Sequence, residues 1–473
     1  MRRLLILSYY FPPSNEVAGK PTARLLWHMP AQGWEPVVVA PRVEAYEALD
    51  PAGYADVQRT VRIERTGIWP SPRSSLLAMK RMARLVTGRG GAVNPQANGA
   101  AQTGAVGVTQ VANTGHGTLR TKLREVFRFP DMYSGWIMPA YRRAAELLRD
   151  EPFDAMLSIS PEVSAHLAAL RLHRRFPHVP WFAQFHDPWS GNPYKQWKSK
   201  TFARWEQRLE SAVVRNCDRL ICATEGAAEA LTLKHRPSQP VLTIHNGFDP
   251  LDFPTMSAAD RTDPRLTFTY TGSLYWTRNP FPLLEALKRL IDAGKLYAEK
   301  VRVRLIGDCE MAVGRSVRTA VDELGLSQVV EIQPPVDYAE ALGALVESDV
   351  LLLFAEDQPV QVPAKLFEYL HVGRPILAFA TGETARIVDD CGAGQAVTSA
   401  DATGIEAAIL ATATLAAATS GRQSNETCGN WPSKIDRFRA DQLAEKLAVA
   451  LNQTVDERAA QRAMKPVAVH TTA

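Results

Sequence analysis

Hydrophobic and polar residues alternate along this chain with two different periods. Short, uninterrupted apolar runs stand between longer stretches in which apolar residues recur every three or four positions. Runs of the first kind are typical of strands buried on both faces, and stretches of the second kind are typical of amphipathic helices. In the first half of the chain, strands are predicted at residues 4–8, 36–40, 155–159, 181–184 and 219–223. Strands that alternate with helices in this way predict a parallel sheet covered on both faces.

The second half of the chain repeats this alternation. Strands are predicted at 266–272 (LTFTYTG), 301–307 (VRVRLIG), 329–335 (VVEIQPP) and 349–354 (DVLLLF). We therefore expect an α/β protein with two doubly wound, Rossmann-like domains that face each other across a cleft. In such sheets, ligands bind beyond the carboxyl ends of the strands.

The expected domain boundaries follow from the two series of elements. The first domain should cover residues 1–245 and the second residues 246–434. An amphipathic helix at 435–455 is expected to cross back to the first domain, and residues 456–473 are expected to form a disordered tail.

The alternation is interrupted between residues 71 and 128. A basic amphipathic segment at 73–89 is followed by a stretch rich in Gly, Ala, Asn, Gln and Thr. This composition predicts a flexible insertion. The basic segment fits either a helix lying on an anionic membrane or a solvated loop helix.

Composition and charge narrow the class of protein. The 473 residues are 46% hydrophobic, which is enough for full cores in two or more domains. A net charge of +4 gives no strong electrostatic case for nucleic-acid binding. The five cysteines are odd in number and include no CxxC pair, so we expect reduced thiols in a cytoplasmic protein rather than disulfides or a zinc ribbon.

Neither a signal peptide nor a metal site is predicted. The first residues, MRRLLILSYYFPPS, begin like a signal peptide, but the apolar run ends at Tyr9 and Tyr10 with no small-residue cleavage site. A core strand is the better interpretation. No apolar run is long enough to span a bilayer, and no DxD motif stands at a strand end.

The segment VPAKLFEYLHVGRPILAF (residues 362–379) joins a short amphipathic helix to a buried strand. Backbone amides near Val362 and Ala364, at the helix start, can bind a phosphate, and Lys365 adds a positive charge there. Glu368, one turn later, can accept hydrogen bonds from a ribose diol. The alternative is an ordinary surface ion pair, which does not explain why the pair stands at a strand end.

Two polar residues, His186 and Asp187, follow the carboxyl end of the predicted strand at 181–184, with Phe185 between. A histidine in this position can contact a substrate hydroxyl or a developing charge, and the adjacent carboxylate can orient a substrate. The alternative is a histidine with a purely structural role.

A loop follows the first strand of each series. In YYFPPSNEVAGKPTAR, Gly19 permits close approach of an anionic ligand to backbone amides. In YTGSLYWTRNP, Gly272 ends the strand and Arg278 suits a bidentate phosphate contact. Taken alone, each signal also fits an ordinary turn or a solvated arginine.

Together these stretches resemble the family 4 glycosyltransferases of the two-domain GT-B architecture. The most specific segments are YYFPPSNEVAGKPTAR, TGSLYWTR and VPAKLFEYLHVGRPIL, and PDMYSGWIMPA resembles a subgroup of bacterial surface-polysaccharide enzymes. The resemblance implies transfer of a sugar from a nucleotide-diphosphate sugar, with a UDP-sugar expected, to a saccharide or lipid-linked acceptor. It also implies retention at the anomeric carbon and no bound metal or other cofactor. The protein is expected in the cytoplasm, and a membrane contact through the basic segment at 73–89 would place it at the inner face of the membrane.

The resemblance also assigns roles to the candidate residues. It places Glu368 at the donor ribose, and it places Lys365, the amides at the helix start and Gly19 near the diphosphate. His186 matches the histidine that contacts the transferred sugar. The family often has an arginine and a lysine five residues apart after the strand that ends at Gly272. Here Ser273 replaces the arginine and Arg278 stands at the lysine position.

One departure from the family pattern keeps two rival functions open. An acidic residue often stands eight positions before the one matching Glu368, but this chain has Val360 there. A non-catalytic partner subunit that binds a nucleotide sugar would retain donor binding without transfer. A nucleotide-sugar epimerase of the same architecture would release free nucleotide without an acceptor.

Overall fold

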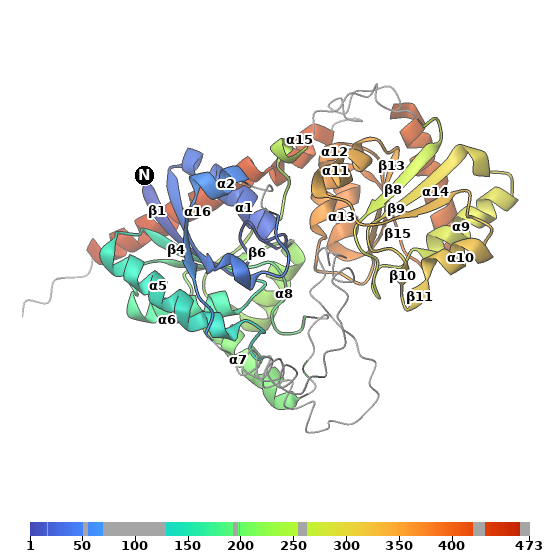
Figure 1. Cartoon of the computed structure of the whole chain (residues 1–473). Helices are drawn as coiled ribbons and strands as arrows, with labels where there is room; N and C mark the ends of the chain where they lie inside the picture. The colour runs from blue at the N-terminus through green and yellow to red at the C-terminus, as the bar shows by residue number, and fades with distance from the viewer. Residues whose placement is uncertain are drawn as a thin grey trace, which may run out of the picture.

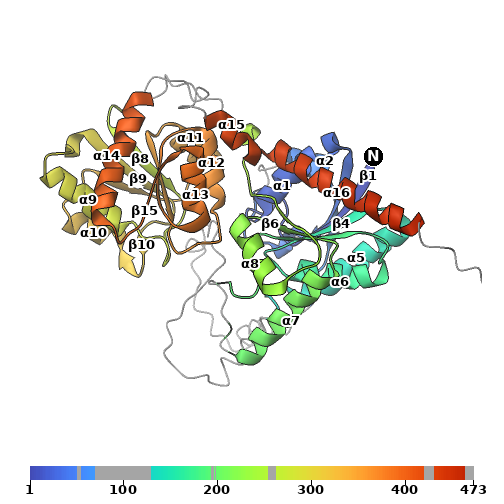
Figure 2. The same ribbon diagram turned by 180° about the vertical axis from the view of Figure 1, so that it is seen from behind.

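The computed structural model describes residues 1–16, 18–50, 55–69, 129–192, 197, 199–253, 263–419 and 431–463. The predicted insertion at 71–128, including its basic segment at 73–89, and the residues after 463 lie outside these ranges. Two α/β domains stand side by side in both views of the chain (Figures 1 and 2).

The N-terminal domain is built on a parallel sheet. Within the described residues it has seven strands in the order β3-β2-β1-β4-β5-β6-β7. The order reverses between β1 and β4, so the loops after these two strands diverge and leave room for a ligand. The strands are β1 (Arg2–Ser8), β2 (Trp34–Pro41), β3 (Arg62–Thr66), β4 (Ala155–Ile159), β5 (Trp181–Phe185), β6 (Arg219–Cys222) and β7 (Val241–Thr243).

Helices cover both faces of this sheet. One face carries α5, α6, α7 and α8, and the other carries α1, α2 and α16. Alternate residues of β1 therefore enter different cores: Leu5 and Leu7 face α5 and α6, whereas Leu4 and Ile6 face α1 and α16. The helices are α1 (Gly19–His28), α2 (Ala55–Thr60), α5 (Ile137–Asp150), α6 (Ser164–Arg175), α7 (Lys200–Asn216), α8 (Glu225–His235) and α16 (Ala440–Ala463).

The C-terminal domain repeats the plan with a parallel sheet in the order β12-β9-β8-β13-β14-β15. Two doubly wound sheets confirm the predicted fold class. The strands are β8 (Leu266–Thr271), β9 (Val301–Ile306), β12 (Val330–Gln333), β13 (Val350–Ala355), β14 (Ile376–Ala380) and β15 (Gly394–Val397), with a small hairpin of β10 (Met311–Ala312) and β11 (Arg315–Ser316).

The helices of this domain also cover both faces of its sheet, with α9, α10 and α14 on one side and α11, α12 and α13 on the other. None of the helices in the described ranges is both long and apolar enough to cross a bilayer. The helices are α9 (Phe281–Asp292), α10 (Val317–Glu323), α11 (Tyr338–Val346), α12 (Ala364–Val372), α13 (Gly382–Cys391), α14 (Ala402–Thr419) and α15 (Trp431–Ile435).

The last helix returns to the N-terminal domain. In Figure 2 the red α16 leads away from α15 and runs along the blue α1 and α2. Leu443, Leu447 and Leu451 are buried in the same core as Leu4 and Ile6. The apolar stripe of this helix therefore completes the first domain.

This C-terminal segment differs from its predicted form in two ways. The helix expected from residue 435 is interrupted by a short 3-10 turn at Asp436–Phe438, and α16 begins only at Ala440. The interruption arises because Phe438 is buried and the amide of Ala440 donates to the carbonyl of Phe248. The helix then continues to Ala463, eight residues past the expected end at 455. Residues 456–463 are therefore helical and do not belong to a disordered tail.

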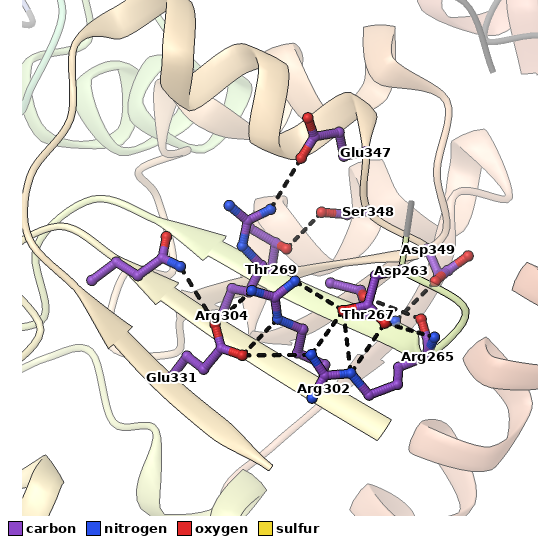
Figure 3. Close-up of polar contacts among 11 residues, drawn as sticks. Asp263, Arg265, Thr267, Thr269, Arg302, Arg304, Glu331, Glu347, Ser348 and Asp349 are labelled. Atoms are coloured by element: carbon purple, nitrogen blue, oxygen red, sulfur yellow. Dashed lines mark hydrogen bonds and ion pairs between the residues drawn. The ribbon is translucent and has the colours of Figure 1, made fainter. Parts of the chain in front are cut away.

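A charged network joins the amino ends of the strands in the second sheet (Figure 3). The guanidinium of Arg302 pairs with both carboxylate oxygens of Glu331, at 2.8 and 2.6 Å, and with Asp263 at 3.1 Å. Arg265 also pairs with Asp263, and its guanidinium holds the pKa of that carboxyl below its usual range. Because ligands of doubly wound sheets bind at the opposite, carboxyl ends, this network has a structural role.

Candidate active site

Two cationic side chains meet at the carboxyl end of β8. The Lys365 ammonium donates to the carbonyl of Thr271 and lies 4.4 Å from the ring centroid of Tyr270. One nitrogen of the Arg278 guanidinium lies 3.1 Å from the Tyr270 hydroxyl and 3.1 Å from the Ser273 carbonyl oxygen. Lys365 and Arg278, 87 residues apart in the chain, are therefore neighbours around one phenol ring.

The proximity of these cations has an electrostatic consequence. Burial and the nearby Arg278 hold the pKa of Lys365 well below its ordinary value. Among the described residues, Lys365 forms no ion pair, while it keeps some surface accessible to a ligand. A ligand with negative charge would relieve the repulsion between the two cations, so the pair is suited to binding an anion.

Gly272 leaves the space in which the Lys365 ammonium lies. Its φ of 118° is one that side chains rarely adopt, and a Cβ built on it would lie 2.5 Å from Lys365 Nζ. Ser273, which stands where the family often has an arginine, contributes its backbone: its carbonyl accepts from Tyr270 and Arg278. Any larger residue at position 272 would displace the ammonium.

Helix α12 presents its first turn toward this pair of cations. Ala364 begins the helix, Val362 is buried just before it, and no described side chain caps its first amides. Leu366 and Leu370 are fully buried and anchor the helix in the core of the domain. The amino end of α12 therefore adds uncapped amides and the positive end of the helix dipole to the anion site.

Glu368 lies one turn along α12 from Lys365, and one of its oxygens contacts the other domain. Its Oε1 accepts from Arg24 of α1 at 3.0 Å and from the Tyr338 hydroxyl at 2.7 Å. Gly19 is the first residue of α1, and the next side chain, Lys20, lies 3.8 Å from the Tyr338 ring centroid. The start of α1 therefore faces α11 and α12.

His186 lies at the carboxyl end of β5, and its ring has a single hydrogen-bond partner among the described residues. Its Nδ1 donates to Asn246 Oδ1 at 2.9 Å, which leaves Nε2 unprotonated in the neutral ring. Nε2 is buried and has no partner within the described part of the chain, and burial lowers the pKa of the ring. A neutral imidazole with one unsatisfied acceptor is suited to receive a hydrogen bond from a sugar hydroxyl.

Asp187 and Val360 lie at a contact between the domains. The Asp187 carboxylate accepts from the Gln361 side chain at 2.6 Å. The Val360 carbonyl accepts from the Thr224 hydroxyl at 2.6 Å. At Val360, where the family often has an acidic residue, it is the backbone carbonyl that contacts the first domain. A role for Asp187 in orienting the substrate stays a prediction.

A different carboxylate, Glu383, crosses the same interface. Its two oxygens accept from the amides of Glu225 and Gly226, the first residues of α8, at 2.8 and 2.5 Å. Glu383 is only 4% exposed, and it belongs to α13 of the second domain. It therefore caps a helix of one domain with a side chain from the other.

Replacing Glu383 with alanine should lower the free energy of unfolding by about 1–2 kcal/mol, because two helix amides lose their carboxylate partner. Urea denaturation measures this change. Glu340→Ala is a matched control, since Glu340 is an exposed glutamate in the first turn of α11. Equal stabilities of the two variants would contradict a stabilising contact at Glu383.

Several residues at this site were missed by sequence reasoning: Arg24, Tyr338, Asn246, Gln361 and Glu383. Most act across the domain interface, and no local pattern marks such contacts. Of these residues, only Arg24 could have been suspected from the sequence, because it is a charged residue within a run of buried residues in α1. Within the described ranges, no three His, Cys, Asp or Glu side chains are arranged to hold a metal ion.

Comparisons with known proteins identify the class of enzyme. Residues 101–250 match the model of Glycosyltransferase Family 4, and residues 265–414 match that of Glycosyl transferases group 1. The chain therefore belongs to the family 4 glycosyltransferases and is an enzyme that transfers a glycosyl group. No curated protein matches it.

Solved structures share the fold along nearly the whole chain. Sucrose-phosphate synthase from Thermosynechococcus elongatus has a TM-score of 0.60 and 15% identity, covering 97% of this chain and 100% of its own. HepE of Anabaena, in complex with UDP and glucose, has a TM-score of 0.58 and 14% identity, covering 96% and 100%. The lipopolysaccharide outer core galactosyltransferase WaaB has a TM-score of 0.55 and 13% identity, covering 97% and 100%.

Proposed function

We propose that this glycosyltransferase moves a sugar from a UDP-sugar to a saccharide or lipid-linked acceptor in bacterial polysaccharide assembly, in the cytoplasm at the inner face of the membrane. The observation that carries the donor site is the meeting of Lys365 and Arg278 at Tyr270, beside the uncapped start of α12. Support for uridine as the base comes from HepE, a protein of the same fold whose structure holds UDP and glucose.

The reaction follows from where the charges lie. As the bond between the sugar and the diphosphate breaks, negative charge grows on the leaving phosphate. Arg278, Lys365 and the first amides of α12 stabilise that charge, which is the main electrostatic contribution to the rate. In this proposal these groups neutralise the diphosphate without a metal ion.

The acceptor approaches from the first domain, where His186 accepts a hydrogen bond from the transferred sugar through Nε2. Its hydroxyl attacks the anomeric carbon on the side that the diphosphate leaves, which retains the configuration. The leaving phosphate takes the acceptor's proton, so no protein nucleophile is needed. The contacts at Glu368, Gln361 and Glu383 close the domains on the donor and exclude water.

Nucleotide binding tests the donor site. UDP is expected to raise the melting temperature, because a ligand that binds only the folded state stabilises it by mass action, and GDP, ADP and TDP should do so less. In Glu368→Ala the shift caused by UDP should be lost. Glu310→Ala, which removes a glutamate from an exposed ion pair with Arg318, is the control and should keep it. No shift with any nucleotide, in well-folded protein, would refute the donor site.

One observation favours a second candidate function, a non-catalytic partner subunit that binds a nucleotide sugar. Val360 replaces the acid that usually stands at this position in the family, and its carbonyl binds Thr224. Such a protein would show the UDP-dependent shift but neither transfer nor hydrolysis of a UDP-sugar. Release of UDP that depends on an added acceptor would exclude it.

A further inference from the structure

Among the residues that the structure describes, only one of the two Glu368 oxygens accepts hydrogen bonds from the protein. Oε1 accepts from Arg24 Nη2 and from the Tyr338 hydroxyl, at 3.0 and 2.7 Å. Within the described residues, Oε2 accepts no hydrogen bond. A carboxylate oxygen can accept two hydrogen bonds, so Oε1 has both of its positions used and Oε2 can still accept two. The Glu368 side chain is 14% exposed, which leaves this oxygen reachable.

Arg24 is itself fixed in place. Its side chain is only 2% exposed, and Nε pairs with Asp252 at 2.5 Å while Nη1 donates to the Gly247 carbonyl at 3.3 Å. The planar guanidinium presents its donors at fixed angles, so contacts on three nitrogens define its orientation. Arg24 belongs to α1 of the first domain, whereas Glu368 belongs to α12 of the second.

Tyr338 is fixed in a similar way. Its hydroxyl donates to Glu368 and also receives a hydrogen bond from Arg24. Lys20 lies over its ring, and burial lowers the pKa of that lysine. Removal of the hydroxyl alone would leave the ring and its contact with Lys20 in place.

We propose that Arg24 and Tyr338 are positioning residues for recognition of the donor ribose, an inference that rests on the proposed function. They hold Oε1 of Glu368 so that Oε2 points at the ribose hydroxyls. Because Arg24 comes from the other domain, the ribose site is complete only when the two domains are closed. The nucleotide is therefore bound tightly by the closed enzyme and weakly by an open one.

Comparison of UDP with 2′-deoxy-UDP tests this role. Calorimetry would give both dissociation constants for the native enzyme, Tyr338→Phe and Arg24→Lys. A hydrogen bond to a charged group makes the native enzyme prefer UDP by about 10- to 100-fold. In both variants UDP binding should weaken by about tenfold, while 2′-deoxy-UDP binding changes little, so the preference falls. If Arg24 and Tyr338 had only a structural role, the variants would lose affinity for UDP and for 2′-deoxy-UDP to the same extent.

Controls and contrary outcomes keep the test decisive. Arg318→Gln removes an arginine from an exposed ion pair with Glu310 and should keep the native preference. If Arg24→Lys fails to fold, Tyr338→Phe carries the test alone, since it removes one hydroxyl. An unchanged preference would overturn the positioning role, and so would tighter UDP binding, which would mean that these contacts compete with the ribose. A native enzyme that binds UDP without any preference would instead refute the ribose role of Glu368.

Discussion

Replacement of Lys365 with methionine should lower the rate of sugar transfer by about 10²–10³-fold, because one of the charges that stabilise the leaving diphosphate is lost. The same change should leave the melting temperature unchanged or raise it. Methionine fills a similar volume, and it removes a cation that burial and Arg278 disfavour. Loss of activity without loss of stability would identify Lys365 as a residue retained for catalysis.

The lowered pKa of Lys365 also predicts two pH dependences. Between this pKa and the ordinary value of 10.5, the unfolded chain binds more protons than the folded protein, so this lysine makes stability rise with pH in that window. A diphosphate binds best to the charged ammonium, so UDP affinity should fall as pH rises through the pKa of Lys365. In Lys365→Met both dependences should disappear.

Transfer assays and thermal melts on Lys365→Met measure these effects. Lys288→Met is a suitable control, since Lys288 forms only an exposed ion pair with Asp292 one turn away. If Lys365→Met kept the native transfer rate, the role of this lysine at the diphosphate would be excluded.

Replacement of His186 with alanine should lower transfer by about 100-fold while UDP binds as before. In the described protein the Nε2 atom has no partner, and in the proposed function it receives a hydrogen bond from the sugar. The residues proposed to hold the nucleotide, Arg278, Lys365 and Glu368, belong to the second domain. Because burial lowers the pKa of this ring, any loss of rate caused by its protonation is expected at a lower pH than for an ordinary histidine.

Steady-state kinetics and UDP titration on His186→Ala separate these two quantities. His178→Ala changes an exposed histidine and should have no effect. Equal losses in UDP affinity and in transfer would show that His186 supports the fold of the site and does not contact the sugar.

The fold was predictable because hydrophobic periodicity is a local property. Strand β4 covers the predicted residues, Ala155–Ile159, and β5 ends one residue after its predicted end at 184. The meeting of Lys365 and Arg278 was also within reach, since both follow the carboxyl ends of strands in one parallel sheet. What such reasoning predicts well is therefore the chemistry contained in one domain.

Contacts between the domains could not be predicted in this way. The partner of Glu368 is Arg24, 344 residues earlier, and Glu383 caps α8 from 157 residues away. Each contact depends on how two separately folded units lie against each other, which no local periodicity encodes. The break before α16 has the same origin, because Ala440 bonds to Phe248 in the segment that joins the domains.

The path of α16 determines when the first domain can complete its fold during translation. Leu443 and Leu447 fill the same core as Leu4 and Ile6, yet the entire second domain is synthesised between them. Domains usually fold in order as they leave the ribosome, but here the first one emerges with an apolar face uncovered. That face stays uncovered until the last helix has been released.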